Sequence, residues 1–191
     1  MTEAPEFEII AEAPVSIAFR QLGITSFRKA AAFVKSLRYA RNERKNDLLA
    51  VLDEQCGTCS TKHALLKTLA EENNYNEIRQ VIGIFRMHPG NTPVIAGTLE
   101  KYGLVYMPEA HSYFRFHGHV FDYTFPRGKA FDIEPELLDE IELTPSQIAD
   151  VKVAYHKQFL DKWLRENPDV PYTLDELWSI REQCIRDLSR T

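Results

Sequence analysis

Cysteine is scarce in this chain, and long apolar runs and excess positive charge are missing. Three cysteines among 191 residues are a small, odd number, which argues against a secreted disulfide framework. A net charge of -5 argues against binding to nucleic-acid phosphates or to a membrane surface through a basic patch. No stretch is long and apolar enough to serve as a signal or bilayer-spanning segment. We therefore expect a cytoplasmic protein with reduced thiols that binds neither nucleic acid nor membrane.

The remaining composition is that of an ordinary globular protein, with 44% hydrophobic and 27% charged residues. No internal repeat or low-complexity segment divides the chain, and its length suits one domain with a substantial core. We expect a single domain over residues 1–191. Residues 1–14 carry several acids and two prolines, so they are expected to form a flexible arm.

Apolar spacing and capping residues predict helices, then strands, then helices, which is the order of an α+β fold with N-terminal helices on an antiparallel sheet. The predicted helices of the first part cover residues 26–42, 47–54, 59–73 and 94–102. Strands are predicted over residues 78–87, 110–116 and 119–125. Two further helices, 144–167 and 173–188, form a C-terminal extension over residues 144–191.

Residues 55–65 carry the clearest chemical signal, because two cysteines lie on either side of Gly57 and Thr58. Thr58 is suited to the N-cap of a helix, which would place Cys59 in the first turn. The unpaired N–H groups and the macrodipole at a helix start favour the thiolate form of a cysteine. Cys56 precedes the helix, so the helix start stabilises its thiolate less. The alternative is that Cys59 is a small hydrophobic core residue, as most unpaired cysteines are.

A predicted hairpin supplies two further groups. His117-Gly118 suits a two-residue type I′ turn, and His111 would then face Thr124 on the other strand. His111 and Asp122 become diagonal neighbours on one face, within reach of a hydrogen bond. A charged Asp122 among aromatic residues also needs a partner. The opposite face carries aromatic core residues, Phe114, Phe116, Phe121 and Tyr123.

Nucleophilic catalysis by cysteine needs a thiolate, an imidazole that holds and returns the proton, and a group that orients the imidazole. Cys59, His111 and Asp122 could supply these three roles in that chain order. An oxyanion would be held by the backbone N–H of Cys59 and one other donor, for which Gln55 is the candidate.

Three motifs resemble those of the transglutaminase-like superfamily of papain-type cysteine enzymes. They are Gly57-Thr58-Cys59-Ser60, His111-Ser112-Tyr113-Phe114 and Val120-Phe121-Asp122-Tyr123-Thr124. The resemblance covers roughly residues 25 to 125. It implies a papain-like α+β fold and a Cys-His-Asp triad acting on a peptide or another amide-containing substrate, with no cofactor. Ser112-Tyr113 replaces the family's usual small-aromatic pair, a departure that bears on the substrate. We expect hydrolysis rather than amine transfer, because water is the default acceptor and no amine site is evident.

The same residues permit other functions. Cys56-Gly57-Thr58-Cys59 is a Cys-x-x-Cys pattern, as in thioredoxin-like redox proteins. That pattern normally follows a strand, whereas residues 47–54 are predicted to be helical, and it leaves His111 and Asp122 without a role. In a variant of this redox alternative, Cys56 is an accessory thiol that forms a reversible disulfide with Cys59.

A zinc site is a weaker alternative. Cys56, Cys59 and His63 are metal-ligand types, and His117 or His119 could add a fourth ligand. No second closely spaced Cys/His pair is present, so no metal is expected. A non-catalytic binding module of the same fold is the last alternative. Nothing in the sequence indicates an oligomeric state.

The two residues Lys62 and His63 follow the thiol by about one helical turn. Lys62 is expected either to be solvated or to assist thiolate formation. His63 is expected to be a surface or packing residue rather than a rival base.

Overall fold

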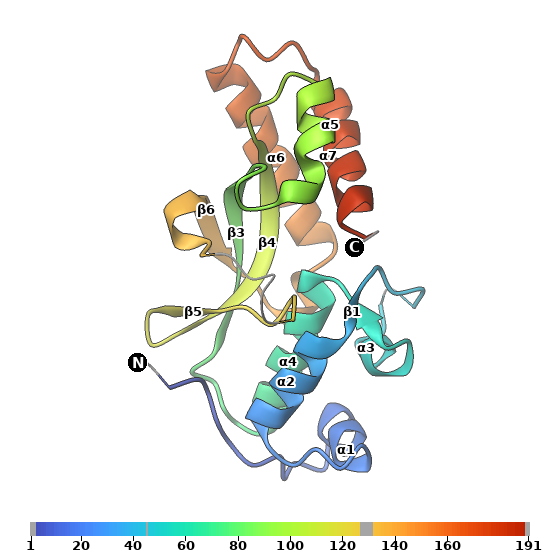
Figure 1. The fold of residues 1–191 in the computed structure, drawn as a ribbon. Helices are drawn as coiled ribbons and strands as arrows, with labels where there is room; N and C mark the ends of the chain where they lie inside the picture. The colour runs from blue at the N-terminus through green and yellow to red at the C-terminus, as the bar shows by residue number, and fades with distance from the viewer. Residues whose placement is uncertain (1–2, 45, 127–131, 190–191) are drawn as a thin grey trace. The chain divides into compact units, whose positions relative to one another are not determined.

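The α+β class predicted from the sequence is confirmed by a computed structural model, which describes residues 3–44, 46–126 and 132–189. The main sheet is antiparallel, with strand order β5-β4-β3-β6, and β1 and β2 form a separate parallel pair (Figure 1). The chain forms two compact units where the sequence predicts one domain. The first comprises Met1–Ile82, His111–Ala130 and Ile141–Ile148, and the second Gly83–Ala110, Phe131–Glu140 and Ala149–Thr191.

The candidate site lies in the first unit, which contains most of the N-terminal elements. These are α1 (Pro14–Gln21), α2 (Phe27–Ser36), β1 (Arg38–Tyr39), α3 (Ala50–Asp53), β2 (Cys56–Gly57), α4 (Cys59–Glu72), β5 (His119–Phe121) and η3 (Pro145–Gln147). The second unit contains η1 (Pro93–Ile95), α5 (Ala96–Lys101), η2 (Glu134–Glu136), α6 (Asp150–Glu166) and α7 (Leu174–Leu188). Three strands contribute residues to both units, namely β3 (Arg79–Met87), β4 (Met107–Phe116) and β6 (Leu137–Glu142).

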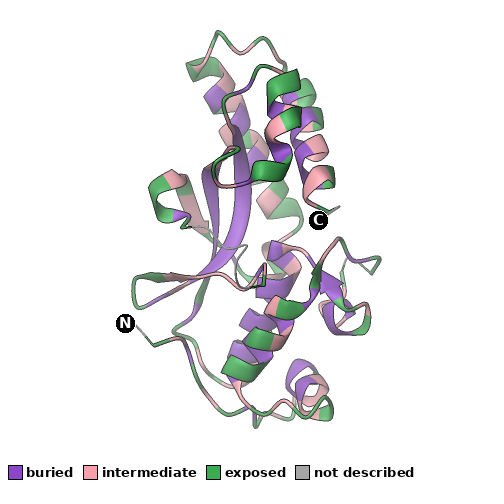
Figure 2. Ribbon diagram, in the orientation of Figure 1, coloured by how far each residue is buried: buried purple, intermediate pink, exposed green. Residues whose placement is uncertain are grey.

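Helix α4 is the central element of the first unit, because α1, α2 and α3 all pack against it. Its leucines Leu65, Leu66 and Leu69 are fully buried in the hydrophobic core. Strands β3 and β4 are also buried along most of their length (Figure 2). A helix surrounded in this way holds its first turn in a defined place, and Cys59 begins that turn.

The predicted hairpin register is confirmed for the residues that pair. Phe114 faces Phe121 and Phe116 faces His119, with positive φ angles of 48° at His117 and 81° at Gly118, as a type I′ turn requires. The predicted strand 119–125 is too long, however, because β5 ends at Phe121. Asp122 therefore lies just beyond the strand. Its carboxylate accepts the Thr124 N–H at 2.8 Å, a local turn that replaces ladder pairing.

Several predicted helices are shorter than expected. Residues 47–54 are helical only over α3, Ala50–Asp53, and residues 94–102 divide into η1 and α5. Helix α2 ends at Ser36 because Leu37 is extended and Arg38–Tyr39 pair with Cys56–Gly57 in β1 and β2. The capping box at Thr144 closes only the short η3 turn, and α6 begins at Asp150. The start of α7 after the Thr173 cap is confirmed. Strand β6 and helix α1 were not expected from the sequence.

The described residues 3–13 of the predicted arm pack against other elements of the first unit. The Phe7 ring stacks on Phe27 with centroids 4.9 Å apart, and Ile9 is 2% exposed in the core. The backbone N–H of Ile10 donates to the Asn73 side chain at 2.9 Å. The acidic residues that suggest an arm are exposed, whereas Phe7 and Ile9 pack into the core.

The packing of this segment can be tested with adjacent isoleucines. Ile9→Ala should lower the free energy of unfolding by about 2–4 kcal/mol, because it leaves a cavity in the core. Ile10→Ala, at a side chain 71% exposed, should change it by less than about 0.5 kcal/mol. Urea denaturation measures both. Equal, small effects would contradict the packed arrangement.

Candidate active site

The first turn of α4 has the predicted cap. The hydroxyl of Thr58 accepts the Thr61 N–H at 3.4 Å, and the Thr61 hydroxyl accepts the Thr58 N–H at 3.0 Å, which makes a capping box. Cys59 therefore opens the helix as predicted. A Cβ atom at Gly57 would lie 2.9 Å from the Thr61 hydroxyl and 3.0 Å from a side-chain carbon of Lys62. The glycine is needed for this close approach.

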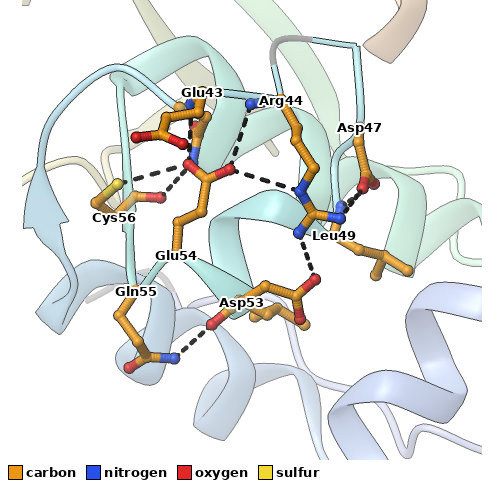
Figure 3. A network of polar contacts seen from close by, with 10 residues as sticks. Glu43, Arg44, Asp47, Leu49, Asp53, Glu54, Gln55 and Cys56 are labelled. Carbon is orange, nitrogen blue, oxygen red and sulfur yellow. Dashed lines mark hydrogen bonds and ion pairs between the residues drawn. The ribbon is translucent and has the colours of Figure 1, made fainter.

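A polar network supports the strand that precedes the thiol (Figure 3). The Arg44 guanidinium binds Asp47 at 2.8 Å and Asp53 at 2.5 Å. The Glu54 carboxylate accepts the backbone N–H groups of Glu43 and Arg44 at 3.0 and 3.3 Å. Glu43 and Arg44 are thereby held beside Glu54, so the two ends of this loop lie side by side.

Asn42 connects this loop to the cysteine turn. Its amide nitrogen donates to the Glu54 carboxylate at 3.1 Å and to the Cys56 carbonyl at 2.9 Å. Its amide oxygen accepts the Thr61 hydroxyl at 3.1 Å. One buried side chain therefore binds the loop, β2 and the first turn of α4.

The proposed oxyanion donor Gln55 has its amide nitrogen engaged elsewhere. That nitrogen donates to the Leu52 carbonyl at 2.5 Å, and Gln55 has a positive φ of 52°. The oxyanion role of Gln55 remains a prediction, and it would require this side chain to turn. Cys56, the predicted accessory thiol, is buried, with its sulfur 3.8 Å from the Asn42 amide nitrogen. All three cysteines lie in described segments, and none forms a disulfide.

The structure brings together Cys59, His111 and Asp122. Nε2 of His111 lies 2.9 Å from the Asp122 carboxylate, and a side-chain hydrogen bond joins His111 to Cys59. Because Nε2 faces the carboxylate, Nδ1 is the ring nitrogen that can face the sulfur. Cys59 is 5% exposed and His111 is 8% exposed, so only a small part of each residue is accessible to solvent.

The electrostatic state of the pair follows from opposing effects. Burial lowers the pKa of His111, but the Asp122 carboxylate and Cys59 outweigh it and raise that pKa to about 10. Burial raises the pKa of Asp122, and His111 outweighs it, so the carboxyl pKa is held well below its usual range. His111 and Asp122 are therefore an imidazolium–carboxylate pair at neutral pH.

Lys62 is fully buried, so the expectation that it could be solvated is wrong. Its ammonium donates to the carbonyls of Leu37 at 2.6 Å and Thr124 at 2.7 Å. Burial lowers the pKa of Lys62 to about 8, against the opposing effects of Asp122 and Cys59. A positive charge is thus held beside the candidate nucleophile and tied to the segment that follows Asp122.

His63 is also fully buried, as a packing residue would be. Its Nδ1 lies 2.8 Å from the Cys59 carbonyl oxygen and its Nε2 accepts the Tyr123 N–H at 3.0 Å. Both ring nitrogens are occupied by backbone groups, so His63 could not ligate zinc without losing one of these bonds. His117 pairs with Glu77 on the surface at 2.8 Å.

Comparisons of the chain with protein-family models, curated proteins and solved structures give no match. In the described parts of the chain, no cluster of three or more His, Cys, Asp or Glu side chains has metal-binding geometry. Within those same parts, no helix combines the length and apolar character needed to cross a membrane.

The sequence does not reveal the partners of several residues that shape the site. It predicts Asn42 only as the end of a helix, and it leaves open whether Lys62 is solvated or assists the thiolate and whether His63 packs or acts as a rival base. The available signal was polar character at positions 62 and 63, inside the apolar-periodic helix that continues to Leu65 and Leu69. Polar side chains on an otherwise buried helix need partners, and here the partners are backbone groups.

The His111–Asp122 pair predicts a pH-dependent stability. The pKa of His111 is raised from 6.5 to about 10 on folding, so its contribution is complete below about pH 6.5 and is lost as the pH rises through about 10. Asp122→Asn should lower the free energy of unfolding by about 3–5 kcal/mol near pH 6, and by clearly less near pH 10. Denaturation across this range measures the difference.

Glu77→Gln is the matched control, because it removes the carboxylate of the exposed His117–Glu77 pair. It should change stability by less than about 1 kcal/mol. A cost of Asp122→Asn that stays constant from pH 6 to pH 10, within about 0.5 kcal/mol, would contradict the charged pair.

Proposed function

We propose that this protein is a cysteine-nucleophile acyl-transfer enzyme of transglutaminase-like type that hydrolyses an amide or peptide bond. The observation that carries the proposal is the contact of His111 with both Asp122, at 2.9 Å, and Cys59. The capped helix start at Cys59 adds support, since it favours a thiolate. Motif resemblance to that superfamily points to the same chemistry.

In the first half of the reaction, the Cys59 thiolate attacks the carbonyl carbon of the amide. The resulting oxyanion accepts hydrogen bonds from the Cys59 backbone N–H and a second donor. His111, as the imidazolium, gives its proton to the leaving nitrogen, the C–N bond breaks, and an amine departs. A thioester to Cys59 and a neutral His111 remain.

In the second half, His111 accepts a proton from a water molecule that attacks the thioester. The C–S bond breaks, the carboxylic acid leaves, and the thiolate–imidazolium pair is restored. Asp122 takes no proton. It keeps Nε2 engaged, so that Nδ1 faces the sulfur and the substrate.

The low exposure of Cys59 and His111 favours a slender acyl group, such as a side-chain carboxamide or an extended peptide. Hydrolysis is preferred over amine transfer because water needs no binding site of its own. A cytoplasmic location belongs to the same proposal, since the reaction requires a reduced thiol.

The activated thiol can be tested without knowing the substrate. In a Cys56→Ser/Cys184→Ala background, the rate of Cys59 alkylation by iodoacetamide should fall by less than about 3-fold between pH 8.5 and pH 6. An ordinary thiol with a pKa near 8.5 loses more than about 100-fold. Each rate is normalised to its value at high pH, which removes the effect of limited access.

His111→Ala in the same background is the control and should restore the steep pH dependence of an ordinary thiol. His119→Ala, at an exposed position of β5, should leave the profile unchanged. An ordinary-thiol profile in the parent protein would overturn the proposed nucleophile.

Activity can be sought with a panel of electrophilic amide and peptide analogues that label an acyl-transfer cysteine. Wild type should be labelled at one site, and Cys59→Ala should lose at least about 10³-fold of labelling and of any amide hydrolysis, because it removes the nucleophile. Cys56→Ser should retain activity within a few-fold. Equal loss in Cys56→Ser and Cys59→Ala would favour the dithiol redox alternative instead.

A further inference from the structure

His63 lies between the helix start that carries Cys59 and the segment that carries Asp122, and it binds the backbone of both. It is on α4, four residues after Cys59, and its ring is fully buried. The Phe114 ring packs edge-on against it, with centroids 4.9 Å apart. The ring is thereby held in one orientation, with Nδ1 toward Cys59 and Nε2 toward Tyr123.

The two hydrogen bonds of His63 define its tautomer. The Cys59 carbonyl, 2.8 Å from Nδ1, can only accept, so Nδ1 must carry a proton. The Tyr123 backbone N–H, 3.0 Å from Nε2, can only donate, so Nε2 must be unprotonated. His63 is therefore the neutral Nδ1–H form. Burial, which lowers its pKa to about 4, agrees with this assignment.

The charged groups around the ring explain why neutrality matters. The Asp122 carboxylate lies 3.8 Å from Nε2 of His63, and its other oxygen binds His111. The positive charges of Lys62 and of the His111 imidazolium oppose a third positive charge on His63. A protonated Nε2 would lose the Tyr123 N–H and compete with His111 for Asp122.

The segment Asp122–Thr124 has no strand partner in the described structure, so side chains hold it in place. Lys35 of α2 donates to the Asp122 carbonyl at 2.9 Å, and Lys62 donates to the Thr124 carbonyl at 2.7 Å. Between them, His63 binds the Tyr123 N–H. Of the three side chains that make these hydrogen bonds, His63 is the one that also binds the backbone of Cys59.

We infer that His63 is a positioning residue for the proposed reaction, and this inference rests on the proposed function. As a neutral Nδ1–H imidazole, it links the Cys59 carbonyl to the Tyr123 N–H. This link sets the distance between the helix that carries the thiol and the segment that carries Asp122. It keeps the Asp122 carboxylate on His111, and through His111 it maintains the proton donor that faces Cys59.

Two amide substitutions separate the halves of this link. In His63→Gln, the side-chain oxygen can take the place of Nε2 and accept the Tyr123 N–H. In His63→Asn, the amide nitrogen can take the place of Nδ1 and donate to the Cys59 carbonyl, but the side chain is too short to reach Tyr123. Both variants keep a polar group in the buried site, so both are expected to fold.

The readouts are nitrogen and carbon NMR titrations of labelled histidines, which need no substrate. In wild type, His63 should be the neutral Nδ1–H tautomer at neutral pH. The pKa of His111 should fall by about one unit or more in His63→Asn and in Asp122→Asn, and should stay near the wild-type value in His63→Gln. Amide hydrolysis, once found, should follow the same order.

A protonated or Nε2–H form of His63 in wild type would overturn the inference. So would an unchanged His111 titration in His63→Asn, because a side chain that only fills space would leave the His111–Asp122 contact intact. Failure of the proposed function is a separate outcome. In that case His111 would respond to His63→Asn as described, while wild type and Cys59→Ala would be equally inactive toward amides.

Discussion

The contact on which this site depends is the buried pair of His111 and Asp122, joined at 2.9 Å. Burial alone would neutralise both groups, lowering the histidine pKa and raising that of the aspartate. Each instead stabilises the charge of the other, and Cys59 adds to the effect on the histidine. Such a pair is favourable only while its geometry is maintained. The surrounding structure therefore has to hold the two side chains of this hairpin region at a defined distance.

That requirement explains the polar residues found inside an otherwise apolar helix. Lys62 and His63 of α4 bind backbone groups of the two residues that follow Asp122. Lys35 of α2 binds the backbone carbonyl of Asp122. Asn42 acts in the same way upstream of the thiol, where it joins Cys56 to Thr61. Asp122 lies in a turn rather than in a ladder, so these side-chain hydrogen bonds take the place of strand pairing in positioning it.

The predictability of these features differs for a physical reason. The cap at Thr58 and the turn at His117-Gly118 follow rules that act over a few residues, and the structure bears them out. The end of β5 at Phe121 depends on a competition between ladder pairing and the local turn of Asp122. Lys62 and His63 each have one partner about sixty residues away, Thr124 and Tyr123 respectively. Polar periodicity can indicate that such partners exist, but only the tertiary fold identifies them.

The thiolate itself is the most direct test of the central claim, that Cys59 and His111 form an ion pair stabilised by Asp122. Thiolate and thiol differ in ultraviolet absorbance, so a pH titration of Cys56→Ser/Cys184→Ala protein, with Cys59→Ser added as the blank, counts the thiolate at Cys59. We predict a thiolate already present at neutral pH that disappears when His111→Ala is introduced. A signal that appears only near pH 8.5, the range of an ordinary thiol, and is unchanged by His111→Ala would contradict the account.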